Sequence, residues 1–94
     1  MTKEEFLKSY DFLKLGENIN HANWQAAYMT ANRMQKNAAE AGVDTFNRQL
    51  LGIKQCINAR QKTEALNILT LIVNKRVQML KEISTDEKPT VREQ

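Results

Sequence analysis

The sequence has 94 residues, 41% hydrophobic and 27% charged, which is enough for one small folded domain and excludes a disordered chain. Three glycines and one proline leave few tight turns, so a helical domain is favoured over a small sheet domain. The single Cys56 and the single His21 form neither an internal disulfide nor a zinc site, and no metal or cofactor is expected. Because there is no long apolar run and no leader-like start, we expect a cytoplasmic protein without a membrane contact.

The net charge of +3 is unevenly distributed. Residues 23–83 hold nine basic residues against four acidic ones, a net charge of +5, whereas residues 1–22 and 84–94 each have a net charge of −1. A basic middle favours an acidic partner or nucleic acid. However, the basic residues are scattered singly and few aromatic residues stand among them to stack on bases. We therefore interpret them as solvated surface and do not expect nucleic-acid binding.

The first helix is expected over 4–15. Thr2 and Glu5 fit a capping box, in which each side chain bonds the other residue's backbone N–H. Gly16 is suited to end this helix in a left-handed conformation, and 17–22 reads as a polar connector.

The second helix is expected over 23–41, with Asn23 as its N-cap and Gly42 as its C-cap. Between them apolar residues recur at helical spacing, large at first and then mostly alanine, which lets a neighbouring helix come close. They are Trp24, Ala27, Tyr28, Ala31, Met34, Ala38 and Ala41.

The third helix is expected over 45–59, after Asp44 as its cap. Gly52 costs about 1 kcal/mol in a helix interior, so we expect another backbone to pack closely against it. The inner positions repeat as in the seam of a bundle and are Phe46, Leu50, Ile53 and Ile57.

The fourth helix is expected over 63–83, capped by Thr63 after a turn at 59–62. Its inner seam is predicted to be Leu66, Leu69, Val73, Val77 and Leu80. A second apolar strip falls outside that seam and comprises Ile68, Leu71, Ile72 and Met79. Either the first helix or a second copy of the chain must cover this strip; the first helix is preferred, and so a monomer is favoured over a homodimer.

Together these patterns predict an all-α, up-down-up-down four-helix bundle at 1–83 with a disordered C-terminal tail at 84–94. The residues expected to be largely buried are Trp24, Ala31, Phe46, Leu50, Ile53, Leu69, Val73 and Val77.

The candidate reactive residues do not have the sequence context of catalytic residues. His21 lies in a connector with no carboxylate at a useful spacing, so we interpret it as an exposed residue rather than a phospho-acceptor or general base. Nothing near Cys56 in the sequence would lower its thiol pKa, and a packing role is preferred. No phosphate cradle or nucleophile motif occurs. We expect no catalytic residue and no enzyme activity.

One stretch resembles a known family. It reads Asn23-Trp24, then Ala31-Asn32-Arg33-Met34-Gln35-Lys36, then Ala41-Gly42. This is similar to the second helix of histidine-containing phosphotransfer domains, which are four-helix bundles of about this size. In that family the helix reads Ala-His-x-Leu-Lys-Gly, with a further Gly ten residues after the His. Ala31, Met34 and Gly42 match the Ala, the Leu and the later Gly, and the resemblance spans roughly residues 20–80.

The departures from this pattern remove its chemistry. Asn32 stands where the family has its phosphorylated His, and an amide cannot carry the phosphoryl group. Gln35 replaces the Lys that would lie beside the phosphate, and Lys36 replaces the Gly that lets a receiver domain approach. The resemblance therefore implies a degenerate, pseudo-phosphotransfer domain.

Two functions compete on this basis. The first is a non-catalytic adaptor of two-component signalling, which docks a receiver domain or a histidine kinase through Met29, Asn32, Arg33 and Lys36. The second is a structural or assembly module that oligomerises through the fourth helix. A helical-repeat fragment is less favoured, since two units make no stable solenoid.

Overall fold

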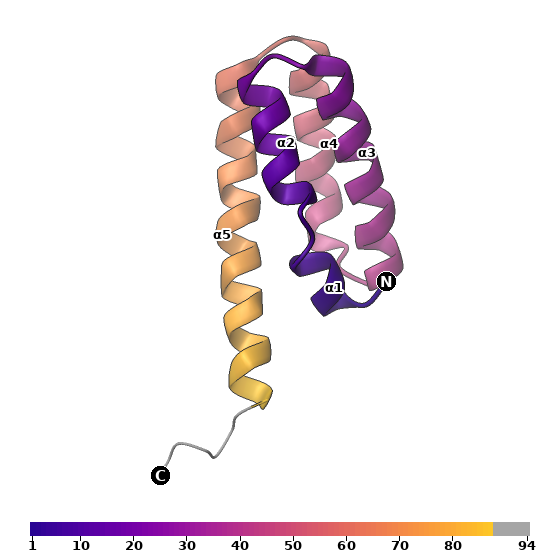
Figure 1. Ribbon diagram of the computed structural model, residues 1–94, viewed down its shortest axis with the longest axis vertical. Helices are drawn as coiled ribbons and strands as arrows, with labels where there is room; N and C mark the ends of the chain where they lie inside the picture. The colour runs from indigo at the N-terminus through magenta and orange to yellow at the C-terminus, as the bar shows by residue number, and fades with distance from the viewer. Residues whose placement is uncertain (88–94) are drawn as a thin grey trace.

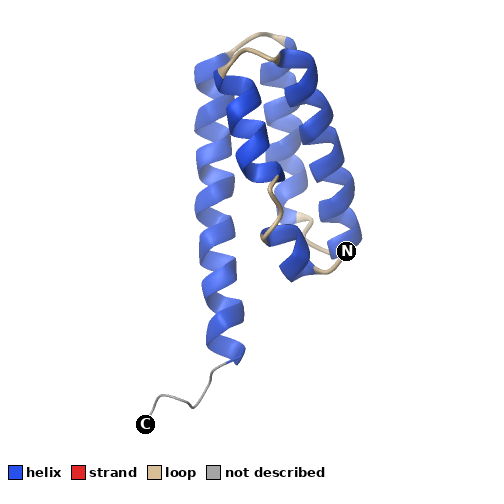
Figure 2. Ribbon diagram, viewed as in Figure 1, coloured by secondary structure: helices blue, strands red, loops and turns tan. Residues whose placement is uncertain are grey.

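The computed structural model describes the backbone of residues 1–87 and the side chains of residues 1–83 (Figure 1). Within residues 1–87 all regular structure is helical (Figure 2). The helices α2 to α5 alternate in direction and pack around one core, which confirms the predicted up-down-up-down four-helix bundle. A short additional helix, α1, precedes them. The elements are α1 (Lys3–Leu7), α2 (Asp11–Asn20), α3 (Trp24–Ala41), α4 (Thr45–Asn58) and α5 (Lys62–Glu87).

The start of the chain follows the predicted capping box. The Thr2 N–H donates to Oε1 of Glu5 over 2.9 Å, and the Glu5 N–H donates to Oγ1 of Thr2 over 3.1 Å. The hydrogen bond from the Thr2 backbone holds the pKa of the Glu5 carboxyl below its usual value. The capping-box prediction is confirmed.

The prediction of a single first helix over 4–15 is wrong. The chain breaks at Lys8–Tyr10, and Oγ of Ser9 accepts a hydrogen bond of 3.0 Å from the Asp11 N–H at the start of α2. A continuous helix would have turned Tyr10 inward with Phe6, but Tyr10 is 77% exposed. The break changes the rotation of α2 so that Phe12 enters the core with the other inward residues of α2, which are Leu15 and Ile19.

Gly16 lies inside α2 and does not end it, which corrects its predicted role as a C-cap. The predicted connector at 17–22 is accordingly shorter, because α2 continues to Asn20. Ala22 adopts a left-handed conformation, with φ of 58°, in the turn between α2 and α3.

The boundaries of α3 and α4 agree with the predictions to within a residue. Gly42 has φ of 75° and ends α3 in the left-handed conformation expected of it. Asn23 and Asp44 occupy the predicted N-cap positions, but neither side chain makes a capping hydrogen bond. The tertiary packing of these helices therefore fixes where they begin.

The last helix, α5, begins at Lys62 rather than at Thr63, after a turn in which Arg60 has φ of 58°. It has 26 residues, a length of about 39 Å, and it runs past the bundle at the end where α1 lies (Figure 1). The molecule measures 51 × 24 × 19 Å. Of the predicted tail at 84–94, the first part continues α5 to Glu87, and 88–94 lie outside the described residues.

The predicted inner seam of α5 is partly wrong. Ile72, placed outside the seam, is completely buried, whereas Val77 is 40% exposed and Val73 is half-buried. The seam is rotated from the predicted one because α5 packs chiefly on α4 and only secondarily on α2. The first helix was expected to cover Leu71, which is instead 57% exposed.

The core contains a cluster of three phenylalanines from α1, α2 and α4. The rings of Phe6 and Phe12 lie 5.3 Å apart, and the ring of Phe46 lies 5.6 Å from Phe6 and 6.1 Å from Phe12. The Phe6–Phe12 and Phe12–Phe46 pairs meet edge to face, and such contacts add to the free energy gained by burial. Of the residues predicted to be buried, Trp24 is half-buried, and five are confirmed, namely Ala31, Phe46, Leu50, Ile53 and Leu69.

The two helix-interior glycines are expected to respond differently to alanine. A Cβ atom at Gly52 would lie 3.5 Å from Cδ1 of Ile68, an ordinary contact with a side chain and not the close backbone that we predicted. Gly52→Ala should therefore stabilise the fold by up to about 1 kcal/mol. A Cβ atom at Gly16 would lie 3.2 Å from Cδ2 of Leu69, which must shift, so Gly16→Ala should gain less. Urea denaturation of both variants measures the difference, and an equal gain at Gly16 would contradict this account.

Candidate functional site

The four residues predicted to bind a partner lie together on one exposed side of α3, which we call the α3 face. Met29, Asn32, Arg33 and Lys36 are all exposed, and Met29 is 61% exposed. They share a side of the helix because they are three, four and seven residues apart. With Gln35 and Asn47 they line a shallow depression of about 790 Å³ between α3 and α4.

Arg33 is fixed by an ion pair that crosses from α3 to α2. Its Nη2 lies 2.9 Å from Oδ1 of Asp11, and its Nε lies 3.2 Å from Oδ2 of the same carboxylate. The hydrogen bond to Asp11 raises the pKa of Arg33 above its usual value. The pair is separated by 22 residues in the chain, which is why the sequence patterns missed it. Arg33 thus adds little net charge to the α3 face.

Lys54 of α4 brings a cation to the α3 face that the sequence patterns also missed. Its Nζ donates to Oδ1 of Asn32 over 3.0 Å and to Oε1 of Gln35 over 2.9 Å. It also lies 5.1 Å from the centre of the Tyr28 ring, an arrangement that favours a cation. The ammonium group therefore lies beside the Asn32 side-chain amide in the middle of the α3 face.

The other candidate reactive residues take no part in the α3 face. His21 is exposed at the C-terminal end of α2. Cys56 is half-buried, and burial, with a smaller contribution from the charge of Glu64, raises the pKa of its thiol. A raised pKa leaves less of the reactive thiolate at neutral pH.

No group of three or more His, Cys, Asp or Glu side chains within the described residues is arranged to hold a metal ion.

Each helix in the described part of the chain is either too short or too polar to cross a bilayer.

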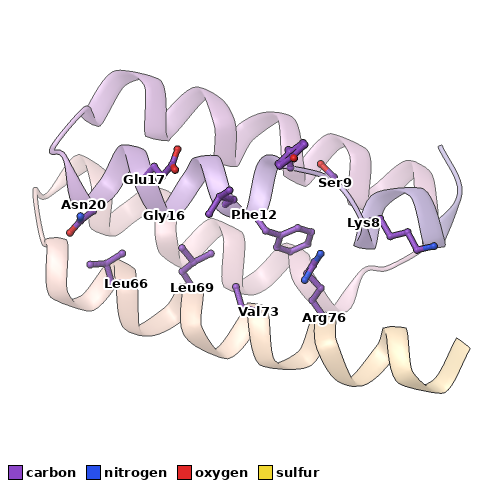
Figure 3. A pocket seen from close by; sticks show the side chains of 12 residues that line it. Lys8, Ser9, Phe12, Gly16, Glu17, Asn20, Leu66, Leu69, Val73 and Arg76 are labelled. Atoms are coloured by element: carbon purple, nitrogen blue, oxygen red, sulfur yellow. The ribbon is translucent and has the colours of Figure 1, made fainter. Parts of the chain in front are cut away.

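A second surface feature, which we call the α2/α5 groove, lies between α2 and α5 (Figure 3). Its volume is about 660 Å³. The sequence patterns missed it because they assigned Leu66 and Val73 to the core seam and ended the first helix before Gly16. The groove is lined mainly by apolar atoms from Phe12, Leu13, Gly16, Leu66, Leu69 and Val73, with polar residues at its two ends.

No protein-family model, curated protein or solved structure matches this chain. The resemblance to histidine-containing phosphotransfer domains stays a prediction that rests on the sequence of α3.

Proposed function

We propose that this protein is a non-catalytic helical protein-interaction module that docks a protein partner through the α3 face. By the resemblance of α3 to the phosphotransfer helix, the partner is a receiver domain or a histidine kinase of a two-component system. Asn32 has no imidazole nitrogen to accept a phosphoryl group. The protein would therefore bind such a partner without taking phosphate from it, and so scaffold or block the relay.

The observation that carries this proposal is the preorganised α3 face. Arg33 is fixed by two hydrogen bonds to Asp11, and Asn32 is fixed by Lys54, so two of its polar side chains lose little conformational freedom when a partner binds. Met29 stands exposed among these polar groups and offers an apolar contact. Apolar contacts of this kind, surrounded by polar groups, are typical of protein interfaces.

The charge of the α3 face favours an acidic partner surface. Lys36 and Lys54 add two positive charges, whereas Arg33 is balanced by Asp11. Positive charge near the contact speeds association with an acidic partner. It also lowers the affinity of this protein for basic partners.

We expect Met29→Glu combined with Lys36→Glu to weaken binding of the partner by at least about a hundredfold. The double variant loses an apolar contact and places two carboxylates opposite an acidic surface. Both side chains are exposed, so the melting temperature should change little. The measurement is calorimetric titration against purified receiver domains and histidine kinases from the same genome.

The matched control is Leu71→Glu combined with Lys75→Glu, which makes the same kinds of substitution on the exposed side of α5. Leu71 is 57% exposed, close to the exposure of Met29. This variant should bind like the wild type. Partner binding that survives in the α3 variant and is lost in the α5 variant would contradict the proposal.

Loss of binding in the α5 variant alone would instead support the second function, an assembly module that oligomerises through α5. The exposure of Leu71 and Val77 on that helix favours this alternative. Sedimentation of the wild-type chain distinguishes the two functions, because an assembly module forms a dimer or a larger species and the adaptor stays monomeric.

A further inference from the structure

We infer that the α2/α5 groove is a binding site for a single-chain anionic amphiphile, an alkyl chain that ends in a carboxylate. This inference does not depend on the proposed function, because the lining of the groove comes from α2, α5 and residues 8–10 before α2 and includes no residue of α3.

The groove has an apolar floor and two apolar walls. Phe12 and Leu69 form part of the floor and are 5% and 6% exposed. Leu66 and Val73 line the α5 side (Figure 3). Leu13, which is 57% exposed, belongs to the α2 side. From Leu66 to Arg76 the groove extends along about 15 Å of helix. A volume of about 660 Å³ is within the usual range for small-molecule sites.

One end of the groove carries a cation that is held in position. The Nε–H of Arg76 donates to the backbone carbonyl oxygen of Leu7, and the guanidinium carbon lies 5.2 Å from the centre of the Phe12 ring. Within the described residues no carboxylate pairs with Arg76, and its two terminal nitrogens have no hydrogen-bond acceptor. A guanidinium fork of this kind matches a carboxylate, which it can bind with two parallel hydrogen bonds.

The neighbouring charges give the ligand a direction. Lys8 lies at the same end as Arg76 and pairs with Glu4 over 2.7 Å, while Asp11 points to Arg33 on α3. Glu17 lies toward the opposite end (Figure 3). A carboxylate is thus attracted to the Arg76 end, and the alkyl chain extends along Val73 and Leu69 toward Leu66.

The narrowness of the groove favours an alkyl chain over a partner helix. At Gly16 helices α2 and α5 come so close that a Cβ atom would lie 3.2 Å from Cδ2 of Leu69 on the floor. A packed helix needs an axis separation of about 8–10 Å from each neighbour, so it would rest on the rim and leave the floor uncovered. An unbranched chain can reach the floor and cover Phe12 and Leu69.

The test uses three probes, namely laurate and dodecyltrimethylammonium below their micelle concentrations and dodecanol below its solubility limit. In methyl-resolved NMR titrations of the full chain, laurate should shift the methyl signals of Leu13, Leu66, Leu69 and Val73. It should bind at least about tenfold more tightly than dodecanol, because a hydrogen bond to a charged group is worth about that factor. The cationic probe should bind more weakly than dodecanol. Arg76→Gln should reduce laurate affinity to that of dodecanol.

Two further variants distinguish a loss of laurate binding from a loss of folding. Leu13→Asp alters an exposed residue of the groove and should abolish laurate binding without lowering the melting temperature appreciably. Leu51→Asp is the matched control, since Leu51 is 47% exposed on α4 and outside the groove, and it should bind laurate like the wild type. Equal binding of the three probes, or laurate shifts away from the groove, would overturn the inference. So would a wild-type dimer that Leu13→Asp dissociates, because a second copy would then occupy the groove.

Discussion

Ile72→Asp is expected to leave the chain unfolded at room temperature. Ile72 is completely buried in the seam of α5, so a carboxylate there would be removed from water. Burying an unpaired charge costs several kcal/mol, which is close to the whole stability of a domain of this size. Loss of the helical circular-dichroism signal would show the effect.

Two neighbouring valines serve as controls for this prediction. Val77→Asp should change stability by less than about 0.5 kcal/mol, because Val77 is 40% exposed and the carboxylate can stay in water. Val73→Asp should fall between the two, since Val73 is half-buried at the edge of the α2/α5 groove. If Val77→Asp were more damaging than Ile72→Asp, the rotation of α5 described above would be incorrect.

Phe46→Ala should lower the free energy of unfolding by about 3–5 kcal/mol, as expected for a fully buried aromatic residue. The ring of Phe46 touches those of Phe6 and Phe12, so its removal leaves a cavity where α1, α2 and α4 meet. Urea denaturation with a linear extrapolation gives the change. The control, Leu51→Ala, removes an exposed side chain of the same helix and should cost less than about 0.5 kcal/mol.

A second measurement tests whether the phenylalanine cluster acts as a unit. The double variant Phe6→Ala with Phe46→Ala should cost less than the sum of the single variants, because the two rings share a contact. Strict additivity would show that the two residues contribute to stability independently. In that case α1 would be attached to the bundle by other contacts.

The sequence by itself determined the all-α class, the number of long helices and most of their boundaries. These features depend on local physics, namely apolar residues at helical spacing and a glycine that tolerates positive φ at the end of α3. The capping box at Thr2 and Glu5 is equally local, and it was predicted correctly. The exposure of the α3 face followed in the same way from the apolar stripe on the other side of that helix.

The tertiary structure alone decided the break between α1 and α2 and the rotation of α5. In both places the apolar residues are numerous enough to define more than one inner face, so periodicity does not choose among them. The neighbouring helix decides which side of each helix faces the core. Because α5 packs chiefly on α4, Ile72 is buried and Val77 is exposed.

The sequence patterns also did not predict the charge contacts or the groove of the candidate sites. Asp11 reaches Arg33 and Lys54 reaches Asn32 only because the bundle brings α2 and α4 against α3, and the partners are 22 positions apart in the sequence in each case. Arg76 likewise meets the Leu7 carbonyl across 69 residues. Helical spacing relates residues up to about two turns apart, whereas these contacts arise from the packing of whole helices, and that is why only the folded chain shows them.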